Sequence, residues 1–333
     1  MFRQGFVYSI LFFFLTACHS PQKQYHTHMG MAEGTTFHIT YSATQNFDKE
    51  IDSLLNHFED ILSTYRPQSV ISRFNRCKHA MVITDSLFWQ MFRKAQEVNK
   101  ATNGAFDITV APLVNAWGFG FADSMQIDSG RIDSLLQFVG MHHLTIHGDT
   151  LIKDHPSVEL DGNAIAKGQS VDYICRFLQQ QGVRNFMVEI GGEVRAEGVN
   201  ADGMAWRIGI DEPIDHNNPL EPQLKAVMRL ENKAVATSGN YRRFYIKNGI
   251  RYSHTINPKT GYPVQHTLLS ASVLTADCMT ADAYATAFMV MGLEQAKMIL
   301  QNNKTLGVFL IYDKNKTNEV FATASFRQLI EPH

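Results

Sequence analysis

Two oxygen-bearing side chains, Asp282 and Thr286, lie four residues apart in a segment, residues 281–291, that is otherwise mainly apolar. In a helix, positions i and i+4 share one face, so this carboxylate and this hydroxyl can converge on one point. Such hard oxygen ligands suit a Mg²⁺ ion that keeps waters and substrate phosphates as its other ligands. The alternative is an acidic residue favoured by the helix macrodipole and a threonine bonded to the backbone, and this segment alone leaves both interpretations open.

A second candidate site lies at residues 160–168, where small residues mark the junction between a strand and a helix. Small residues let a ligand approach the backbone, free N–H groups at a helix start attract phosphate, and Lys167 can add a positive charge. An N-capping Asp161 and an exposed lysine would explain much of the same pattern.

His254 is a candidate general base because it precedes a turn bounded by Pro258 and Gly261, at the end of an expected strand. A histidine at the edge of a cleft titrates near neutral pH and can accept a proton from a substrate hydroxyl. Most single histidines are structural or solvated, so the position alone is weak support.

Two further segments could hold an aromatic ligand. Residues 104–110 place Asp107 among apolar neighbours, and residues 63–75 combine Tyr65 with several hydroxyl-bearing side chains after a helix. A tyrosine ring can stack on a ring ligand while the hydroxyls bond to it, although turn chemistry explains both segments equally well.

The N-terminus predicts a bacterial lipoprotein signal. Arg3 precedes an apolar run at residues 6–15, which is too short to span a bilayer, and small residues lead into Cys18. We expect a signal peptide at residues 1–17, a lipid such as palmitate on Cys18, and a flexible tether over residues 18–33. The tether histidines, His26 and His28, are expected to be solvated.

Composition excludes several classes of protein. Of the 333 residues, 44% are hydrophobic, and 30 basic against 32 acidic side chains give a net charge of −2. This chain should bury a large core, and it lacks the basic excess of a nucleic-acid-binding protein. Cys77, Cys175 and Cys278 form no C-x-x-C pair, so neither a disulfide framework nor a zinc site is predicted. Nucleotide-binding loops and hydrolase nucleophile elbows are absent from the sequence.

Expected strands and helices position these residues, and they do not alternate strictly along the chain. This order favours an α+β fold with one large domain at residues 34–333. Hydrophobic periodicity and turn residues define the expected elements. These are strands at 35–42, 185–190 and 306–312, helices at 48–65, 86–102, 164–181, 279–291 and 294–302, and a strand-rich region at 206–272.

Taken in order, these segments resemble the ApbE family of bacterial flavin transferases, over about residues 34–321. The ordered set is far more specific than any single motif. Its members are Gly34-Thr35, residues 65–75, 104–110, 161–168, Gly191-Gly192, the stretch WRIGIDEP at 206–213, residues 237–239, 253–261 and 281–292.

The resemblance implies an ApbE-like, T-fold-like domain with a strand-rich core and packed helices, and it assigns roles to particular positions. It implies FAD binding by the residues that match the family's cofactor contacts: Tyr65, Ala105, Phe106, Asp107, Asp161, Lys167 and Ile256. It also implies Mg²⁺ held by Asp282, Thr286 and the backbone carbonyl of Ala164. Two positions depart from the family pattern. Glu33 stands where the family often has Met, and Ala285 where some members have a second carboxylate, leaving the metal with one fewer anionic ligand.

The implied reaction is transfer of FMN from FAD to a Thr or Ser hydroxyl of an acceptor flavoprotein, with a phosphoester formed and AMP released. His254 would act as the base. The implied acceptor is a subunit of a membrane redox complex on the periplasmic side, beside the lipid-anchored enzyme. Two alternatives are a Mg²⁺-dependent FAD pyrophosphatase that releases free FMN, and a flavin-binding lipoprotein without catalytic activity.

Overall fold

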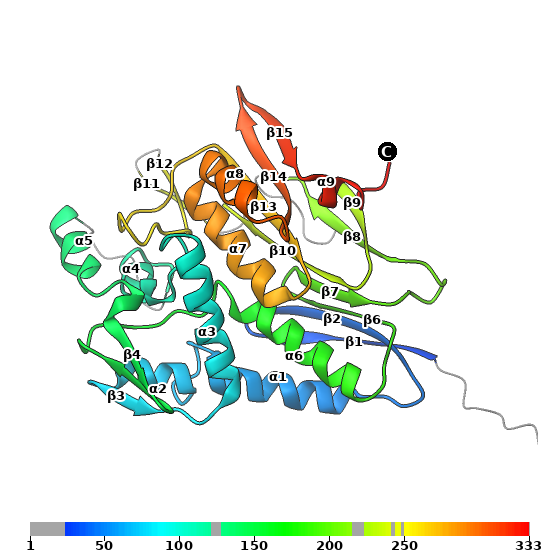
Figure 1. The fold of residues 1–333 in the computed structure, drawn as a ribbon, viewed down its shortest axis with the longest axis horizontal. Helices are drawn as coiled ribbons and strands as arrows, with labels where there is room; N and C mark the ends of the chain where they lie inside the picture. Colours follow the sequence, from blue (N-terminus) through cyan, green and yellow to red (C-terminus); the bar gives the residue numbers. More distant parts are fainter. Residues whose placement is uncertain (1–23, 121–127, 215–222, 241–243, 248–249, 333) are drawn as a thin grey trace, which may run out of the picture.

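The structure is a computed structural model that describes residues 24–120, 128–214, 223–240, 244–247 and 250–332. An eight-stranded sheet runs through it in the order β1-β2-β6-β7-β10-β13-β14-β15, and every neighbouring pair is antiparallel (Figure 1). The strands are β1 (Gln24–Ala32), β2 (Thr35–Ala43), β6 (Phe186–Ile190), β7 (Glu193–Glu197), β10 (Lys233–Gly239), β13 (Leu268–Thr275), β14 (Gly307–Lys314) and β15 (Thr317–Ala322). An antiparallel sheet with segregated helices is the predicted α+β class.

Helices cover one face of this sheet. The helix α7 (Cys278–Met291) packs on β10 and β13, and α6 (Ala166–Gln180) packs on α7, β6 and β7 (Figure 1). Around them lie α1 (Asp48–Leu62), α3 (Ser86–Ala101) and α8 (Leu293–Asn302). Because α7 is buried over most of its surface, its apolar residues join the main core, and a charged side chain such as Asp282 needs a partner there to offset the cost of burial.

A smaller lobe packs beside α3 and carries several predicted ligand segments. It contains the three-stranded sheet β3-β5-β4 and a separate apolar cluster that includes Leu113, Trp117 and Ile256. Its elements are α2 (Val70–Arg76), β3 (Ala80–Val82), η1 (Ile108–Val110), α4 (Ala111–Ala116), α5 (Ser129–Leu136), η2 (Met141–His143), β4 (Leu144–His147) and β5 (Thr150–Lys153). The hairpin β11 (Phe244–Lys247) and β12 (Ile250–Ser253) lies near this lobe (Figure 1).

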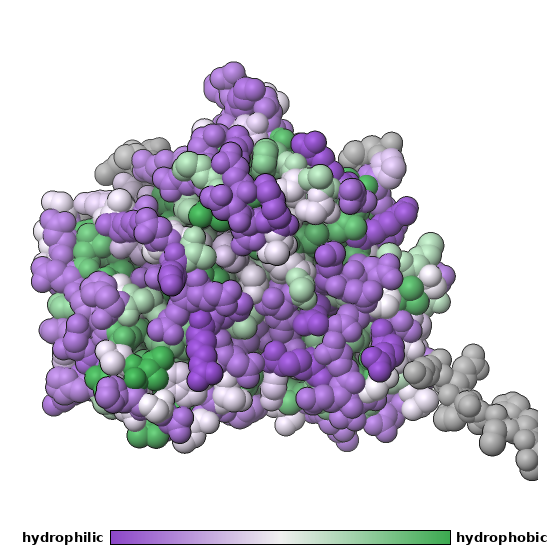
Figure 2. All heavy atoms as spheres, in the orientation of Figure 1, coloured by the Kyte–Doolittle hydropathy of each residue, from purple (hydrophilic) through white to green (hydrophobic). Residues whose placement is uncertain are grey.

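The opposite face of the main sheet carries the hairpin of β8 (Trp206–Asp211) and β9 (Leu224–Leu230), with the short helix α9 (Ala324–Arg327) nearby. Trp206, Ile210 and Met228 pack with inward residues of β7 and β10 to form a core on this side. Among the described residues, no helix is long and apolar enough to cross a membrane. Figure 2 shows a largely hydrophilic surface over the helical face, with hydrophobic residues in scattered groups.

Most predicted elements are confirmed within a few residues, but the tether is wrong from Gln24 onward. Residues 24–32 form the edge strand β1, which pairs with β2 along its whole length. A hairpin turn joins the two strands, in which Glu33 and Gly34 have φ of 54° and 72°. Such left-handed backbone at both turn positions is typical of a two-residue hairpin. His28 is not merely solvated, because its Nε2 atom forms a hydrogen bond of 2.7 Å with Asp52 Oδ1.

Candidate active site

The site is centred on the start of α6, where the Lys167 ammonium lies among buried carboxylates. Lys167 Nζ donates a hydrogen bond to Glu193 Oε1 at the start of β7. Glu193 and Asp282 are only 3% and 2% exposed. Burial raises the pKa of both carboxyl groups, and the positive charge of Lys167 opposes that rise. In turn, although burial lowers the pKa of Lys167, the Glu193 and Asp282 carboxylates raise it overall, so the lysine stays charged.

Asp282 caps the start of α6. Gly168 N–H lies in the first turn of this helix, where backbone amides have no partner within the helix, and it donates to Asp282 Oδ2 at 3.0 Å. Among the described residues, no hydrogen bond reaches the Ala164 carbonyl oxygen. A carboxylate therefore caps the start of α6, and the Ala164 carbonyl belongs to the turn just before this helix. Both are hard oxygen ligands.

Thr286, one turn further along α7, completes the predicted oxygen set. Its hydroxyl is 3.1 Å from the Ser238 hydroxyl at the end of β10. In the described part of the chain, this site included, no group of three or more His, Cys, Asp or Glu side chains could hold a metal ion. The donors present fit Mg²⁺ with water and phosphate ligands, and they do not suit a site built only from protein side chains. Ala285 is fully buried in the core, so it adds no ligand.

The predicted flavin-binding segments converge through hydrogen bonds. Asn75 bonds to the backbone of Leu160 in both directions, with each distance 2.8 Å. Asp161 N–H donates to the Ile108 carbonyl at 2.6 Å. The segments at 63–75, 104–110 and 160–168, which are far apart in the chain, are thus fixed side by side.

Asp107 is held rigidly within this group. Its Oδ1 caps η1 by accepting from Thr109 N at 2.9 Å, and its Oδ2 accepts from Asn99 at 3.0 Å. Burial raises the pKa of Asp107, and the hydrogen bonds from Thr109 and Asn99 lower it. Burial also raises the pKa of Asp161, which the amide of Asn163 partly offsets.

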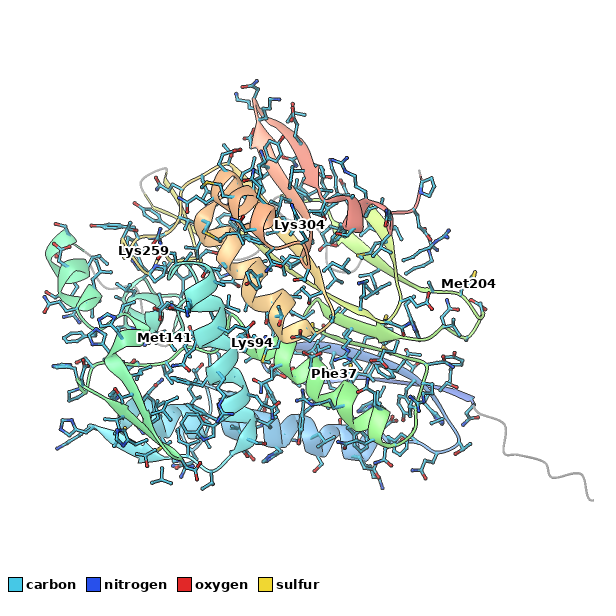
Figure 3. All side chains as sticks on the ribbon, viewed as in Figure 1. Phe37, Lys94, Met141, Met204, Lys259 and Lys304 are labelled. Carbon is cyan, nitrogen blue, oxygen red and sulfur yellow. The ribbon has the colours of Figure 1, made fainter. Side chains whose placement is uncertain are left out.

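The remaining predicted flavin residues differ in exposure. Ala105, Phe106 and Ile256 are buried, so they can offer backbone or an apolar wall, whereas Tyr65 is 58% exposed and its ring is accessible to a ligand. A Cβ atom on Gly104 would lie 3.6 Å from Lys259 Cε, which brings the turn after β12 to this segment (Figure 3).

His254 follows β12 directly, and its half-buried ring packs edge-on against Phe119 with ring centroids 6.4 Å apart. Its role as the base stays a prediction. Cys18 lies outside the described residues, so its lipidation also stays a prediction.

Sequence reasoning missed Glu193 and Ser238, which pair with Lys167 and Thr286. Glu193 directly follows Gly191-Gly192, a stretch already singled out, and strand alternation from Val194 would have placed its side chain on the helical face. Glu33 was noted in the sequence only because it departs from the family pattern. Its Oε1 is buried without a hydrogen-bond partner among the described residues.

An α+β fold that places a lysine and hard oxygen donors at a helix start defines an enzyme-like site, and such a site suits a phosphate-bearing ligand. Residues 33–310 match the ApbE family. The chain therefore belongs to the ApbE family.

Relatives cover almost the full chain. A Vibrio cholerae protein described as FAD:protein FMN transferase is 39% identical over 329 residues, which are 95% of this chain and 96% of that protein. An Escherichia coli K12 protein of the same description is 31% identical, over 93% of this chain and 92% of its own. The solved flavin transferase ApbE of Vibrio cholerae superposes with a TM-score of 0.82 at 37% identity, over 92% of this chain and 99% of the other.

Proposed function

We propose that this protein is a Mg²⁺-dependent FAD:protein FMN transferase, which attaches FMN to a Thr or Ser hydroxyl of an acceptor flavoprotein through a phosphoester bond. The observation that carries the proposal is the junction of α6 and α7, where buried Asp282 caps the first turn of α6 through the Gly168 amide and lies within the field of the Lys167 charge. Among the described residues, the Ala164 carbonyl just before this helix accepts no hydrogen bond. The names of relatives that match over nearly the whole chain support the same activity.

The chain's own residues would first bind and orient FAD. Lys167, held by Glu193 at the start of α6, supplies a fixed positive charge for the pyrophosphate. The exposed ring of Tyr65 and the segments around Phe106 and Asp161 supply surfaces for the ring systems of FAD.

Asp282, Thr286 and the Ala164 carbonyl would hold Mg²⁺. When bound, Mg²⁺ offsets negative charge on the pyrophosphate as the bond between the two phosphates breaks. The hydroxyl oxygen of the acceptor bonds to the FMN phosphorus, its proton passes to His254, and AMP leaves with the bridging oxygen.

The lipoprotein signal predicted before Cys18, here called the lipobox, supports a location on the periplasmic side of the bacterial membrane. The protein would be anchored there through lipidated Cys18. A membrane tether raises the effective concentration of the enzyme near acceptors in membrane redox complexes.

The direct test is to incubate the protein with FAD and candidate acceptors, with and without Mg²⁺. The proposal expects the acceptor to gain the mass of FMN less one water, with one AMP released per adduct and neither product formed without Mg²⁺. AMP and free FMN with an unmodified acceptor would instead identify a pyrophosphatase.

A further inference from the structure

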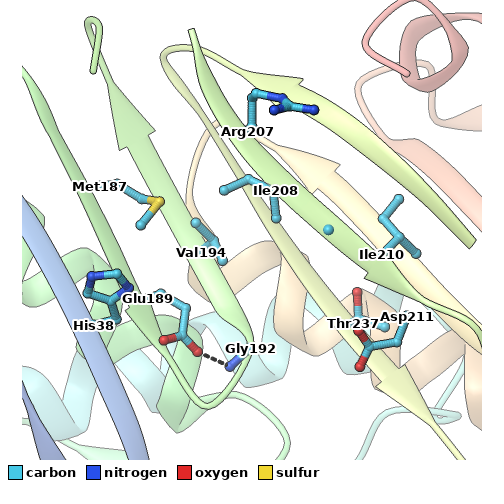
Figure 4. A pocket seen from close by; sticks show the side chains of 11 residues that line it. His38, Met187, Glu189, Gly192, Val194, Arg207, Ile208, Ile210, Asp211 and Thr237 are labelled. Atoms are coloured by element: carbon cyan, nitrogen blue, oxygen red, sulfur yellow. Dashed lines mark hydrogen bonds between the residues drawn. The ribbon is translucent and has the colours of Figure 1, made fainter. Parts of the chain in front are cut away.

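A groove of about 270 Å³ lies on the face of the main sheet opposite α6 and α7 (Figure 4). His38, Met187 and Val194 line it from the main sheet, and residues 207–211 of β8 line the other side. None of the predicted FAD or metal residues lines it. Its volume is below the roughly 300 Å³ at which pockets for drug-sized ligands begin, so it is too small for FAD.

The β8 side of this groove is a strand edge. Strand β9 is paired on both sides, because Arg229 N–H also donates to the Leu329 carbonyl at 2.7 Å, and Glu331 N–H to the Val227 carbonyl at 2.8 Å. Within the described part of the chain, β8 pairs only with β9. An outer strand edge is a template for an extended peptide.

One end of the groove meets the candidate active site. Gly192 lines the groove, and a Cβ atom on its neighbour Gly191 would lie 3.2 Å from Lys167 Cδ. Thr237 also lines the groove, whereas the next residue of β10, Ser238, faces Thr286 on the helical side. Gly192 and Thr237 are thus the groove residues whose chain neighbours contact Lys167 and Thr286.

We propose that this groove docks the acceptor protein, with an extended segment pairing along β8 and presenting its hydroxyl residue past Gly192 and Thr237. This inference rests on the proposed FMN transfer. It also gives a role to the stretch at 206–213, which resembles the family and contains none of the predicted FAD or metal residues. Apolar Met187, Val194 and Ile208 can take alternate side chains of the segment while its backbone bonds to β8.

The probe is an array of 12-residue peptides, each with one central Thr or Ser among varied neighbours, incubated with the protein, FAD and Mg²⁺. The peptide that gains FMN fastest is then resynthesised with a single N-methyl group at each position in turn. Strand pairing on one edge predicts losses of at least tenfold at every second position on one side of the hydroxyl residue. Equal effects at all positions, or none, would overturn strand pairing.

The protein side is tested with His38→Trp, which fills the groove, against Thr40→Trp, which lies two residues along the same face of β2 and outside the groove. His38→Trp should raise the KM for the peptide at least tenfold, with kcat, FAD affinity and melting temperature equal to those of Thr40→Trp. An unchanged KM would remove the groove as the docking site. If the wild type labels no peptide, FMN transfer itself is wrong and the docking proposal falls with it, whereas labelling without either effect contradicts docking alone.

Discussion

At the α6–α7 junction, ionisable side chains are buried, which is rare in a folded chain. Asp282 is 2% exposed, yet among the described residues its carboxylate accepts a single hydrogen bond, from the Gly168 amide. A buried carboxylate with spare acceptor capacity costs stability unless a cation balances it, and Lys167 provides that charge in part. The residual acceptor capacity is what a metal ligand requires.

Asp282→Ala should lower Mg²⁺-dependent turnover by about 10²–10³-fold, because Ala285 beside Thr286 leaves the helix no second carboxylate. Asp282→Asn keeps an acceptor for the Gly168 amide and serves as the control for helix packing. Turnover measured over a Mg²⁺ titration checks this. Wild-type rates for Asp282→Ala at ordinary Mg²⁺ would eliminate the metal site.

His254→Ala should bind FAD normally and slow transfer by about 10²–10⁴-fold, the usual span of general base catalysis. FAD affinity and single-turnover transfer are measured on one preparation. A structural histidine would instead lose melting temperature and FAD affinity together, and an unchanged transfer rate at saturating FAD would exclude His254 from the chemistry.

Glu33→Gln should stabilise the protein increasingly as pH rises. Burial raises the pKa of Glu33 to about 8, with the Ser170 hydroxyl and Lys167 opposing the rise. The ordinary pKa is 4.5, so between these values the folded state holds a proton that the unfolded state has lost, and stability falls as pH increases through this window.

We expect the gain from Glu33→Gln to be about 3–4 kcal/mol larger at pH 8.5 than at pH 5, because each tenfold difference in proton affinity between the folded and unfolded states corresponds to about 1.4 kcal/mol. Thermal melts across this pH range measure it. Glu231→Gln removes a charge from an exposed turn and is the control. The same pH trend in both variants would contradict a special role for burial at Glu33.

At the scale of elements, the close crossing of α6 and α7 sets the geometry of the site. A Cβ atom on Gly168 would lie 2.3 Å from the Cys278 carbonyl oxygen and 2.8 Å from Asp282 Cβ. Because the nearest of these atoms is backbone, a side chain at this position must separate the helices.

Gly168→Ala should therefore destabilise the fold by about 1–3 kcal/mol through overpacking and reduce activity by displacing Asp282. Gly162→Ala is the matched control, since its Cβ would meet only side-chain atoms at 3.7 and 3.8 Å. Urea unfolding and transfer rates are compared for both. Equal stability of the two variants would show that the helices can separate without cost.

Some elements of the fold could be predicted from the sequence, and others could not. Segments with a buried face, such as α1, α3 and β2, carry the expected periodicity and were predicted within a few residues. Strand β1 has no buried residue, so it lacked that signal, and only the hairpin turn at Glu33-Gly34 could have indicated it. The structure brings the segments at 63–75, 104–110 and 160–168 side by side. The pairs Lys167–Glu193 and Gly168–Asp282 join residues 26 and 114 positions apart, and no local sequence pattern predicts such long-range contacts.

Because residues 24–32 form strand β1, the expected membrane tether shortens to residues 18–23. A chain of this length spans at most about 20 Å, so the folded domain would lie close to the membrane surface. An enzyme held in this way can reach only acceptors that expose their hydroxyl segment near the same membrane.

Cys18→Ser should release the protein from membranes without a change in melting temperature or in FAD affinity, because no predicted site residue is near it in the sequence. Stable anchoring requires more than one acyl chain, and all of the expected chains are attached through Cys18. Its loss should therefore release the protein completely. Membrane fractionation after a salt wash measures it, and a variant that stays with the membranes contradicts the lipobox.

The central claim is that an acceptor hydroxyl, and not water, attacks the FMN phosphorus of FAD. The measurement that tests it most directly is the reaction with FAD, Mg²⁺ and an acceptor in ¹⁸O-water, followed by mass analysis of every product. If the acceptor hydroxyl attacks, the products are an acceptor–FMN adduct and AMP, both without ¹⁸O. Free FMN that carries ¹⁸O in its phosphate, together with an unmodified acceptor, would contradict it.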